Sequence, residues 1–304
     1  MNNETHPTNH NTGPLSTYGF LIVGLVRNCA DKIVADVARL RQAIGAAKQV
    51  HWLLIESDSN DLTLVALEKL SKQIPNFRFI SLGTLRSTMP LRTQRIAHCR
   101  NEYLKQIRQC DAYKNLDYVI ASDFDGLNTH LSAAAIESCW ERNDWDMCSA
   151  NQLGPYYDIW ALRHPLWSPN DCWAQFHFLA AYEPDTEKNL FDSVYSRMIR
   201  IPAESSWIEV DSSFGGFAIY KKELFSLADY VGLDDAGKEL CEHVAFHAQL
   251  KSQGARLFIN PKLINANYTE HTVHLLFSKT VVRRFKSAVK RAIGFFWQVK
   301  KAGV

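Results

Sequence analysis

The sequence predicts an α/β fold with a mostly parallel sheet flanked by helices. Short apolar runs alternate with stretches of helical spacing across the first 150 residues, a pattern that favours parallel strands joined by right-handed crossovers. The chain has 304 residues, of which 46% are hydrophobic and 22% charged, enough for a large buried core. We therefore expect a polar leader at 1–17 and a single globular domain over 18–275.

The first half of the chain predicts four strands separated by three helices. The stretch after Asp31 places Ile33, Val37 and Leu40 at helical spacing. Asp61 is an expected N-cap for the second helix, and the run HWLLI reads as a buried strand. The strands are expected over 19–29, 51–55, 77–82 and 118–121, and the helices over 31–47, 62–74 and 92–110.

The second half predicts fewer regular elements. A helix over 132–142 and a strand over 147–150 are followed by an aromatic, irregular stretch over 156–197. Its rings suit either a sugar-facing wall or core filling beneath loops. Gly215 and Gly216 precede an apolar run and predict positive φ or a close backbone approach. A helix over 242–254 and a short strand over 257–259 complete the expected elements.

Several classes of protein are disfavoured by missing motifs. The seven cysteines are odd in number and scattered, without Cys-x-x-Cys, so we expect reduced thiols in a cytosolic protein. Neither a Gly-x-Gly-x-x-Gly nor a Walker loop occurs, which disfavours dinucleotide oxidoreductases and P-loop enzymes. Residues 1–16 are polar and unlike a signal peptide, and no run reaches the roughly 20 apolar residues of a membrane span.

The net charge of +2 hides a basic tail. Residues 279–304 hold eight Lys or Arg and no acid, so the rest of the chain carries −6, the difference between +2 and +8. Apolar residues from Val281 to Trp297 recur at three- to four-residue spacing. We expect a basic amphipathic helix over 276–304 that lies on an anionic membrane surface, or alternatively docks on the body. No nucleic-acid-reading motif accompanies the charge.

Two carboxylates follow the predicted strand 118–121. Asp123 and Asp125 flank one phenylalanine at the carboxyl end of that strand, where open α/β sheets bind ligands. Paired oxygen ligands suit Mg²⁺ or Mn²⁺ that also binds water and phosphate. The alternative is a capped strand end. A second copy, Asp144-Trp145-Asp146, precedes its apolar run and reads as a strand start or turn.

Further polar side chains lie where a nucleotide would bind such a sheet. Glu56 and Asp58 end the second predicted strand and could face a ribose or base, or simply solvent. Arg92, Arg95 and Arg100 lie on the helix that precedes the two acids. Arginine suits phosphate because its planar group donates two parallel hydrogen bonds. A solvated helix face is the alternative reading.

Two acids in the second half are candidates for the acceptor side of a site. Asp211 precedes the glycine pair and could bind acceptor hydroxyls or open a turn. Glu242 begins a predicted helix and could face a reacting centre, or be a surface acid stabilised by the helix dipole.

Histidines supply further metal-ligand candidates. His243 and His247 are four residues apart on one helix face, a spacing that suits either a metal or packing within the core. His271 or His274 follows the last predicted strand and could complete a metal shell begun by the two aspartates.

The order of these motifs resembles that of a known enzyme class. A strand followed by ESDS, a helix with RN, then YVIASDFDG, VDSSFGG, EHVAFH and INP resembles the nucleotide-sugar glycosyltransferases of the GT-A fold. The resemblance covers about residues 18–275 and is nearest to the fungal capsular α-1,3-mannosyltransferase-type family. The Golgi α-mannosyltransferase complex subunits are a more distant likeness.

The resemblance implies a role for each candidate residue. The Asp-x-Asp motif of such families holds Mn²⁺ against the diphosphate of the donor, and here that motif is Asp123 and Asp125. It also implies that Glu56 and Asp58 face the nucleoside and that Arg100 contacts the phosphates. Asp211 and Glu242 would then contact the acceptor or the reacting centre.

The resemblance also has a departure. The fungal enzymes carry an N-terminal membrane anchor, and this sequence shows none. We therefore expect a cytosolic, peripheral membrane transferase of surface polysaccharide synthesis, which moves a sugar from a nucleotide sugar to a glycan or lipid-linked acceptor; the resemblance implies mannose as that sugar. A metal-dependent phosphodiesterase or nucleotidyltransferase, or a non-catalytic sugar-nucleotide-binding subunit, are the alternatives.

Overall fold

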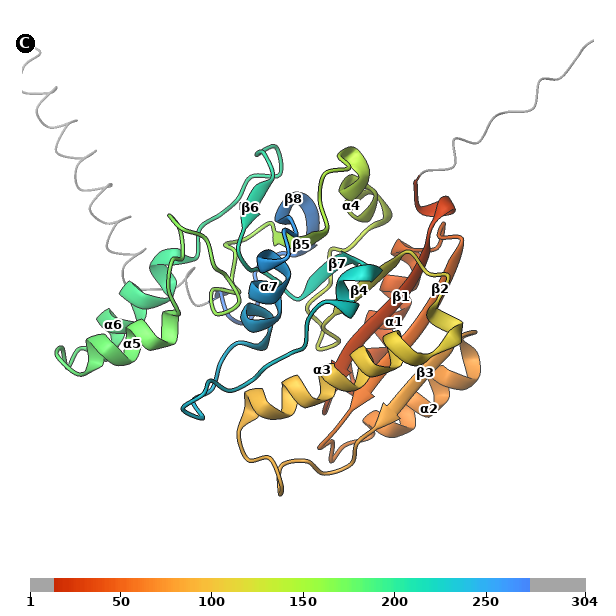
Figure 1. Cartoon of the computed structure of the whole chain (residues 1–304), viewed down its shortest axis with the longest axis horizontal. Helices are drawn as coiled ribbons and strands as arrows, with labels where there is room; N and C mark the ends of the chain where they lie inside the picture. The colour runs from red at the N-terminus through yellow and green to blue at the C-terminus, as the bar shows by residue number, and fades with distance from the viewer. Residues whose placement is uncertain (1–13, 274–304) are drawn as a thin grey trace, which may run out of the picture. The chain divides into compact units, whose positions relative to one another are not determined.

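The computed structural model describes residues 14–273, and its strands form one mixed eight-stranded sheet (Figure 1). The strand order is β3-β2-β1-β4-β7-β5-β8-β6. The strands are β1 Gly19–Val26, β2 Gln49–Glu56, β3 Phe77–Ser81, β4 Tyr118–Ser122, β5 Met147–Gln152, β6 Ile208–Val210, β7 Phe217–Lys221 and β8 Leu257–Ala266. The expected α/β fold with a mainly parallel sheet is confirmed.

The direction of each strand decides which loops share an edge of the sheet. The first four strands in the order are parallel, β7 is antiparallel to both β4 and β5, and β8 is parallel to β5. Because β7 reverses direction between them, β4 and β5 run the same way. The carboxyl ends of β1, β2, β4, β5 and β8 therefore meet at one edge, together with the amino end of β7.

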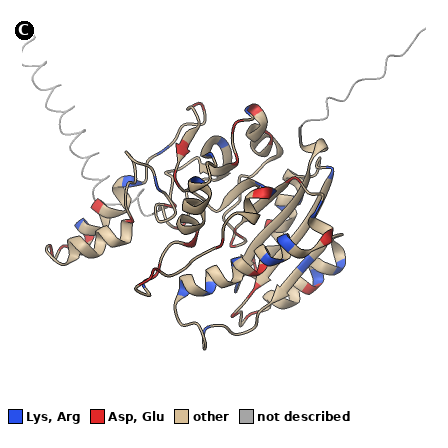
Figure 2. Cartoon of the chain, in the orientation of Figure 1, with Lys and Arg blue, Asp and Glu red and all other residues tan. Residues whose placement is uncertain are grey.

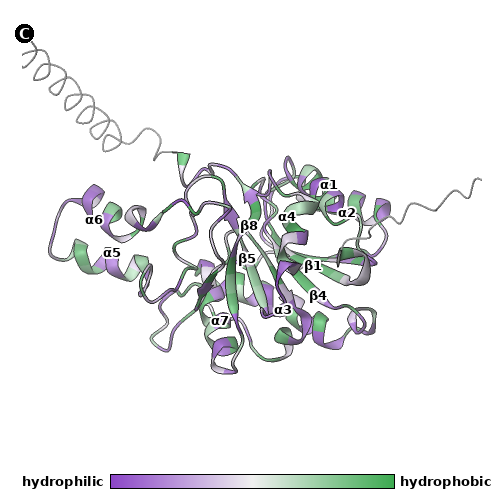
Figure 3. Ribbon diagram, turned by 90° about the horizontal axis from the view of Figure 1, so that it is seen from above, coloured by the Kyte–Doolittle hydropathy of each residue, from purple (hydrophilic) through white to green (hydrophobic). Residues whose placement is uncertain are grey.

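Helices cover both faces of this sheet (Figure 3). In β1, Phe20 and Ile22 pack in a cluster with the helices of one face, and Leu21 and Val23 pack with those of the other. This alternation is the two-residue period of a strand that is buried on both sides. The first face carries α1 Ile33–Ala43, α2 Thr63–Gln73 and α4 Ala133–Glu137, and the second carries α3 Arg92–Gln109 and α7 Glu242–Ser252.

The aromatic middle of the chain contains two helices that the sequence pattern did not predict. They are α5 Cys172–Ala180 and α6 Thr186–Ser193, which pack against each other. Each begins at an aspartate, Asp171 or Asp185, whose side chain accepts hydrogen bonds from backbone N–H groups of the first turn. Trp173 and Phe178 of α5 are exposed. Apart from Gln175 and His177, the residues of α5 are apolar, so the helix shows no clear helical periodicity in sequence.

Two strands near the end of the chain also differ from expectation. The short strand β6 was not predicted, and β8 continues to Ala266 rather than ending at Ile259. The pairing of β5 with β8 shifts register between Ser149 and Asn151, opposite the stretch that contains Pro261. A bulge accommodates a proline within a strand because no ladder hydrogen bond is required there.

The chain divides into two compact units, Met1–Asn267 and Tyr268–Val304. The predicted leader and the predicted basic helix over 276–304 lie outside the described residues, apart from the end of the leader. Within residues 14–273, no helix is both long and apolar enough to cross a membrane. All seven cysteines are free thiols.

Candidate active site

The two predicted acids lie directly after β4, at the carboxyl edge of the sheet. The backbone N–H of Asp123 donates to the carbonyl of Gly216 at 2.9 Å, which continues the pairing with β7. Phe124 is buried, whereas Asp125 is exposed. Gly24 makes room for the ring, because a Cβ there would lie 2.4 Å from Phe124 Cε2. The buried ring anchors the tripeptide and leaves the two carboxylates at the sheet edge.

Three carboxylates and one guanidinium act on Asp123. Burial and the charge of Asp125 raise the pKa of Asp123 to about 8, and the charges of Asp158 and Glu242 act in the same direction. Arg100 is the neighbour that lowers it. Asp123 therefore holds a proton near neutral pH unless another cation compensates the surrounding negative charge.

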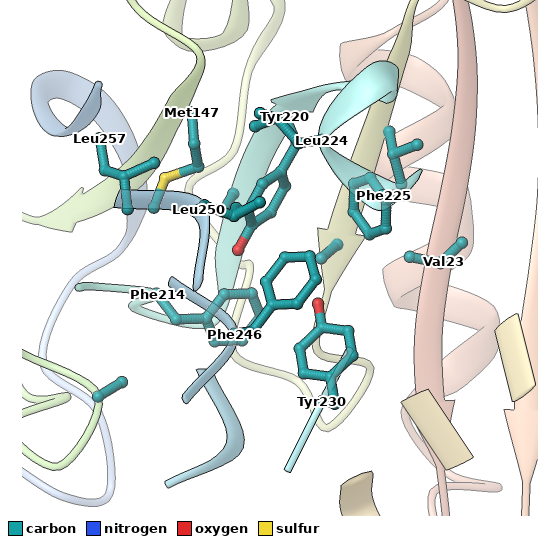
Figure 4. Close-up of a cluster of buried hydrophobic side chains, with 14 of the residues drawn as sticks. Val23, Met147, Phe214, Tyr220, Leu224, Phe225, Tyr230, Phe246, Leu250 and Leu257 are labelled. Carbon is teal, nitrogen blue, oxygen red and sulfur yellow. The ribbon is translucent and has the colours of Figure 1, made fainter. Parts of the chain in front are cut away.

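A buried ion pair fixes the acid at the start of α7. Arg100 Nε lies 3.0 Å from Glu242 Oε1, and both side chains are buried. The guanidinium carbon of Arg100 lies 5.4 Å from the ring centre of Phe214 and 5.5 Å from that of Tyr230. Both rings belong to the buried hydrophobic cluster in Figure 4. Removing one partner of such a pair typically costs about 3–5 kcal/mol. Glu242 is therefore held in one orientation.

Asp158 joins this cluster, although no sequence motif marks it. Its Oδ2 accepts a hydrogen bond from the backbone N–H of Gly215 at 2.9 Å. Burial, followed by the charge of Asp158 and then that of Asp123, raises the pKa of the adjacent Tyr157 well above its ordinary value. The available signal was an acid in the loop that follows β5, where the carboxyl ends of parallel strands meet.

The glycine pair brings the loop before β7 close to the acids. Gly215 and Gly216 have φ values of 69° and 80°, so the expected positive φ is confirmed. A Cβ on Gly216 would lie 2.8 Å from the hydroxyl of Tyr157 and 3.4 Å from Asp123 Oδ2. Only glycine allows the backbone to adopt this conformation and approach both groups without strain.

Hydrogen bonds among buried side-chain amides hold this loop in place. Asn128 Nδ2 donates to the carbonyl of Asp123 at 2.9 Å, and its Oδ1 accepts from Asn265 Nδ2 at 2.8 Å. Asn265 Nδ2 also donates to the carbonyl of Gly215 at 2.8 Å, and Gln152 Nε2 donates to Asn265 Oδ1 at 3.0 Å. These side chains connect β5, β8 and the two loops, so the positions of the acids are defined by several elements.

The two residues predicted to contact a nucleoside, Glu56 and Asp58, lie at the end of β2, and both interact with other residues of the protein. Glu56 is buried and accepts hydrogen bonds from the backbone N–H of Ser59 and the hydroxyl of Ser81. Asp58 accepts from the backbone N–H of Arg86 at 2.9 Å and lies 3.6 Å from Arg95 Nε. Both acids hold loops at the carboxyl edge, and their contact with a nucleoside stays a prediction.

Basic residues recur along α3 (Figure 2), and two of the three predicted arginines, Arg95 and Arg100, have different surroundings. Arg95 donates to the carbonyls of Met89 and Pro90 at 2.6 and 2.7 Å, so it fastens the loop before α3. Arg100 alone of the two interacts with Asp123 and Glu242. A phosphate contact by Arg95 remains an untested prediction.

Asp211 is not brought to this cluster. Its side chain is 58% exposed and lies 3.9 Å from Lys251 Nζ. Lys251 is near the C-terminal end of α7, whereas Glu242 is the first residue of that helix. Those two helix residues are roughly 14 Å apart at 1.5 Å per residue. The reason is strand direction: β6, which ends just before Asp211, is antiparallel to β8, so its carboxyl end lies at the other edge of the sheet.

The histidines differ in what the structure shows of them. His247 is buried and bonded, with Nδ1 2.9 Å from Ser212 Oγ and Nε2 2.9 Å from the hydroxyl of Tyr220. His243 stacks on Phe214 at 4.0 Å. Both are therefore packed within the core, one of the two readings expected from their spacing. His271 belongs to the second compact unit, and its place in a metal shell stays a prediction, as does that of His274, beyond the described residues.

The second Asp-x-Asp copy has a structural role. Asp144 forms salt bridges with Arg142 and Arg256, each at 2.6 Å. The hydrogen bonds from these arginines, that of Arg142 above all, hold the pKa of Asp144 well below its usual range. Asp146 accepts from the backbone N–H of Arg256 and from Lys221 Nζ. This copy immediately precedes β5, as its position in the sequence indicated.

The donor groups of the site fit a hard divalent cation. Among residues 14–273, no three His, Cys, Asp or Glu side chains are placed to enclose a metal on their own. Asp123 and Asp125 interact strongly enough to raise the pKa of Asp123. Two such carboxylates suit Mg²⁺ or Mn²⁺ when water and phosphate supply the remaining ligands.

Comparison with known proteins gives matches only among solved structures. No protein-family model matches the chain, and no curated protein matches it. The fungal capsular family that the motif order resembles is therefore not confirmed.

Three solved structures show the range of the likeness. Mannosyltransferase PcManGT from Pyrobaculum calidifontis, in complex with GDP-Man and Mn²⁺, is 14% identical with a TM-score of 0.48, over 92% of this chain and 67% of that one. S. aureus TarS with UDP-GlcNAc is 13% identical with a TM-score of 0.47, over 83% and 59%. Glucosyl-3-phosphoglycerate synthase from Mycobacterium tuberculosis with UDP is 11% identical with a TM-score of 0.40, over 90% and 80%. With TM-scores below 0.5, these likenesses carry no weight in assigning a reaction to this chain.

Proposed function

We propose that the protein is a metal-dependent glycosyltransferase that uses a nucleotide-sugar donor. The observation that carries the proposal is the cluster at the carboxyl edge of the sheet, where three carboxylates, those of Asp125, Asp158 and Glu242, act on Asp123 together with one guanidinium, that of Arg100. Such a site lacks positive charge. A divalent cation supplies positive charge, and the diphosphate bound with it provides phosphate oxygens as further ligands of the cation.

Asp123 and Asp125 would hold the cation, Mn²⁺ or Mg²⁺. When bound, the cation stabilises the charge that develops on the departing nucleoside diphosphate. The contribution of the chain is positioning: Phe124 anchors both carboxylates, and Gly216 lets the neighbouring loop approach Asp123 Oδ2 closely. A site fixed by packing needs little reorganisation during the reaction.

Glu242 is the proposed group for the acceptor or the reacting centre. It is the first residue of α7, is held by Arg100, and acts electrostatically on Asp123. A carboxylate at this position can accept a hydrogen bond from the attacking hydroxyl or stabilise positive charge at the sugar carbon. Asp158 is a positioning residue, because its Oδ2 already binds the backbone N–H of Gly215.

The acceptor and the cellular location are proposed from sequence. The basic segment 276–304 would hold the enzyme on the cytosolic face of an anionic membrane, where a lipid-linked acceptor of polysaccharide synthesis would lie. Mannose is the first donor sugar to test, because the motif order resembles mannosyltransferases.

The test is a nucleotide-sugar panel with the purified full chain, Mn²⁺ and an acceptor mixture, with EDTA as the control. A glycosyltransferase releases a nucleoside diphosphate, and the sugar appears on the acceptor. Release of a nucleoside monophosphate and a sugar phosphate would instead identify a phosphodiesterase that uses the same acids. Tight donor binding without any product would identify a non-catalytic binding subunit.

A further inference from the structure

Helix α1 holds the turn that follows the two acids through a buried carboxylate. Asp36 Oδ2 accepts a hydrogen bond from the backbone N–H of Gly126 at 2.8 Å, and Asp36 is only 4% exposed. Gly126 has φ of 89°, a conformation that strongly favours glycine. The hydrogen bond therefore sets the direction in which the chain leaves Asp125.

A lysine on the same helix lies against the same glycine. Lys32 precedes Asp36 by four residues, which places both on one side of the helix. A Cβ on Gly126 would lie 3.1 Å from Lys32 Cδ and 3.7 Å from Lys32 Cε. The aliphatic part of Lys32 thus packs over the turn after Asp125. Because Lys32 is exposed, its ammonium group reaches solvent near this turn.

Helix stability does not explain a lysine at this position. Lys32 is the N-cap residue of α1 and makes no side-chain capping hydrogen bond. A positive charge at a helix N-terminus is opposed by the helix dipole. Among residues 14–273 Lys32 forms no salt bridge, although its charge counteracts the rise that burial causes in the pKa of Asp36. A ligand that brings negative charge to this end of α1 would account for the lysine.

We propose that α1 forms the phosphate side of the donor site, with Lys32 binding the diphosphate and Asp36 positioning the turn that carries Asp125. This inference rests on the proposed function, because it takes the ligand to be a nucleoside diphosphate. Lysine is a point-charge phosphate binder that adapts through its flexible stem. Asp36 keeps its carboxylate oxygen on Gly126 and touches no ligand itself.

The test for Lys32 is calorimetric binding of UDP, GDP, CDP and ADP to the full chain in the presence of Mn²⁺. Lys32→Met keeps the aliphatic stem and removes the charge. We expect this variant to bind the tightest-binding nucleotide about tenfold or more weakly, the size of a charged hydrogen bond, without a lower melting temperature. Lys32→Arg should restore most of the affinity, and Lys69→Met, at an exposed lysine on α2, should change nothing. Free phosphate should compete only weakly if the site is built for a nucleotide.

The test for Asp36 separates its hydrogen bond from its charge. Asp36→Asn keeps an oxygen for the Gly126 N–H, so nucleotide affinity should stay within about threefold, whereas Asp36→Leu should lose tenfold or more. Unchanged affinity in both Lys32→Met and Asp36→Leu, with normal binding by the wild type, would overturn this inference alone. If the wild type binds neither UDP, GDP, CDP nor ADP with Mn²⁺, the proposed function itself fails.

Discussion

Gly216→Ala tests whether the loop before β7 needs its close approach to the acids. The residue has φ of 80°, so alanine there costs roughly 1–2 kcal/mol from backbone strain. The new methyl would also lie 2.1 Å from Leu127 Cδ2 and 2.8 Å from the hydroxyl of Tyr157. Leu127 can rotate, but the tyrosine hydroxyl lies beside Asp123, and overpacking of this kind typically costs about 1–3 kcal/mol more. The expected total is about 2–5 kcal/mol.

Gly237→Ala is the matched control. Gly237 has φ of 77°, nearly the same as Gly216, but a Cβ there would meet no heavy atom within 4 Å. It should lose only the backbone term, about 1–2 kcal/mol. Urea unfolding of both variants measures the difference, and sugar transfer should fall in Gly216→Ala alone. Equal losses of stability, with transfer unchanged in both variants, would refute the close approach.

Three further outcomes are expected. Glu242→Gln should lower transfer by at least about 10²-fold, the low end for a positioned acid or base, with donor binding retained, whereas Asp211→Ala should be nearly silent in the same assay because Asp211 lies away from the cluster. Burial and the charge of Asp125 raise the pKa of Asp123 from 3.8 to about 8, so the folded state binds this proton more tightly than the unfolded state. With EDTA, the contribution of Asp123 to stability should be lost as pH rises from 3.8 through about 8. Melting scans over this pH range measure the loss. It should be absent when Mn²⁺ is added, and absent in Asp123→Asn. Truncation after His274 should release the protein from anionic vesicles without lowering its melting temperature; a destabilised variant with unchanged vesicle binding would instead support a docked helix.

The sequence predicted the elements whose patterns were unambiguous. The runs that became β1, β2 and β4 are largely apolar, because both faces of these strands are covered by helices. Helix α5 was missed because its residues are apolar except for Gln175 and His177, which leaves no clear helical period. Strand β6 has three residues, too few to establish any period.

Sequence position was enough to select acids that adjoin a strand or helix end, but it could not place an acid whose location depends on strand direction. Asp123, Asp125 and Glu242 could be selected because each lies next to a recognisable strand or helix. Asp211 was selected for its glycine neighbours, but the antiparallel direction of β6 places it at the other edge of the sheet. Asp158 lies in a loop of no regular pattern, and only the fold brings it near Asp123.

The central claim is that Asp123 and Asp125 hold a divalent cation with the donor diphosphate. The most direct measurement compares Asp125→Asn with Asp144→Asn in Mn²⁺-dependent sugar transfer by the full chain. The two substitutions are chemically identical and affect two Asp-x-Asp copies, one beside the proposed donor and one in salt bridges with Arg142 and Arg256. We expect Asp125→Asn to abolish transfer while retaining its melting temperature, and Asp144→Asn to keep nearly full activity. Full transfer by Asp125→Asn, or activity of the wild type that is unaffected by EDTA, would contradict the claim.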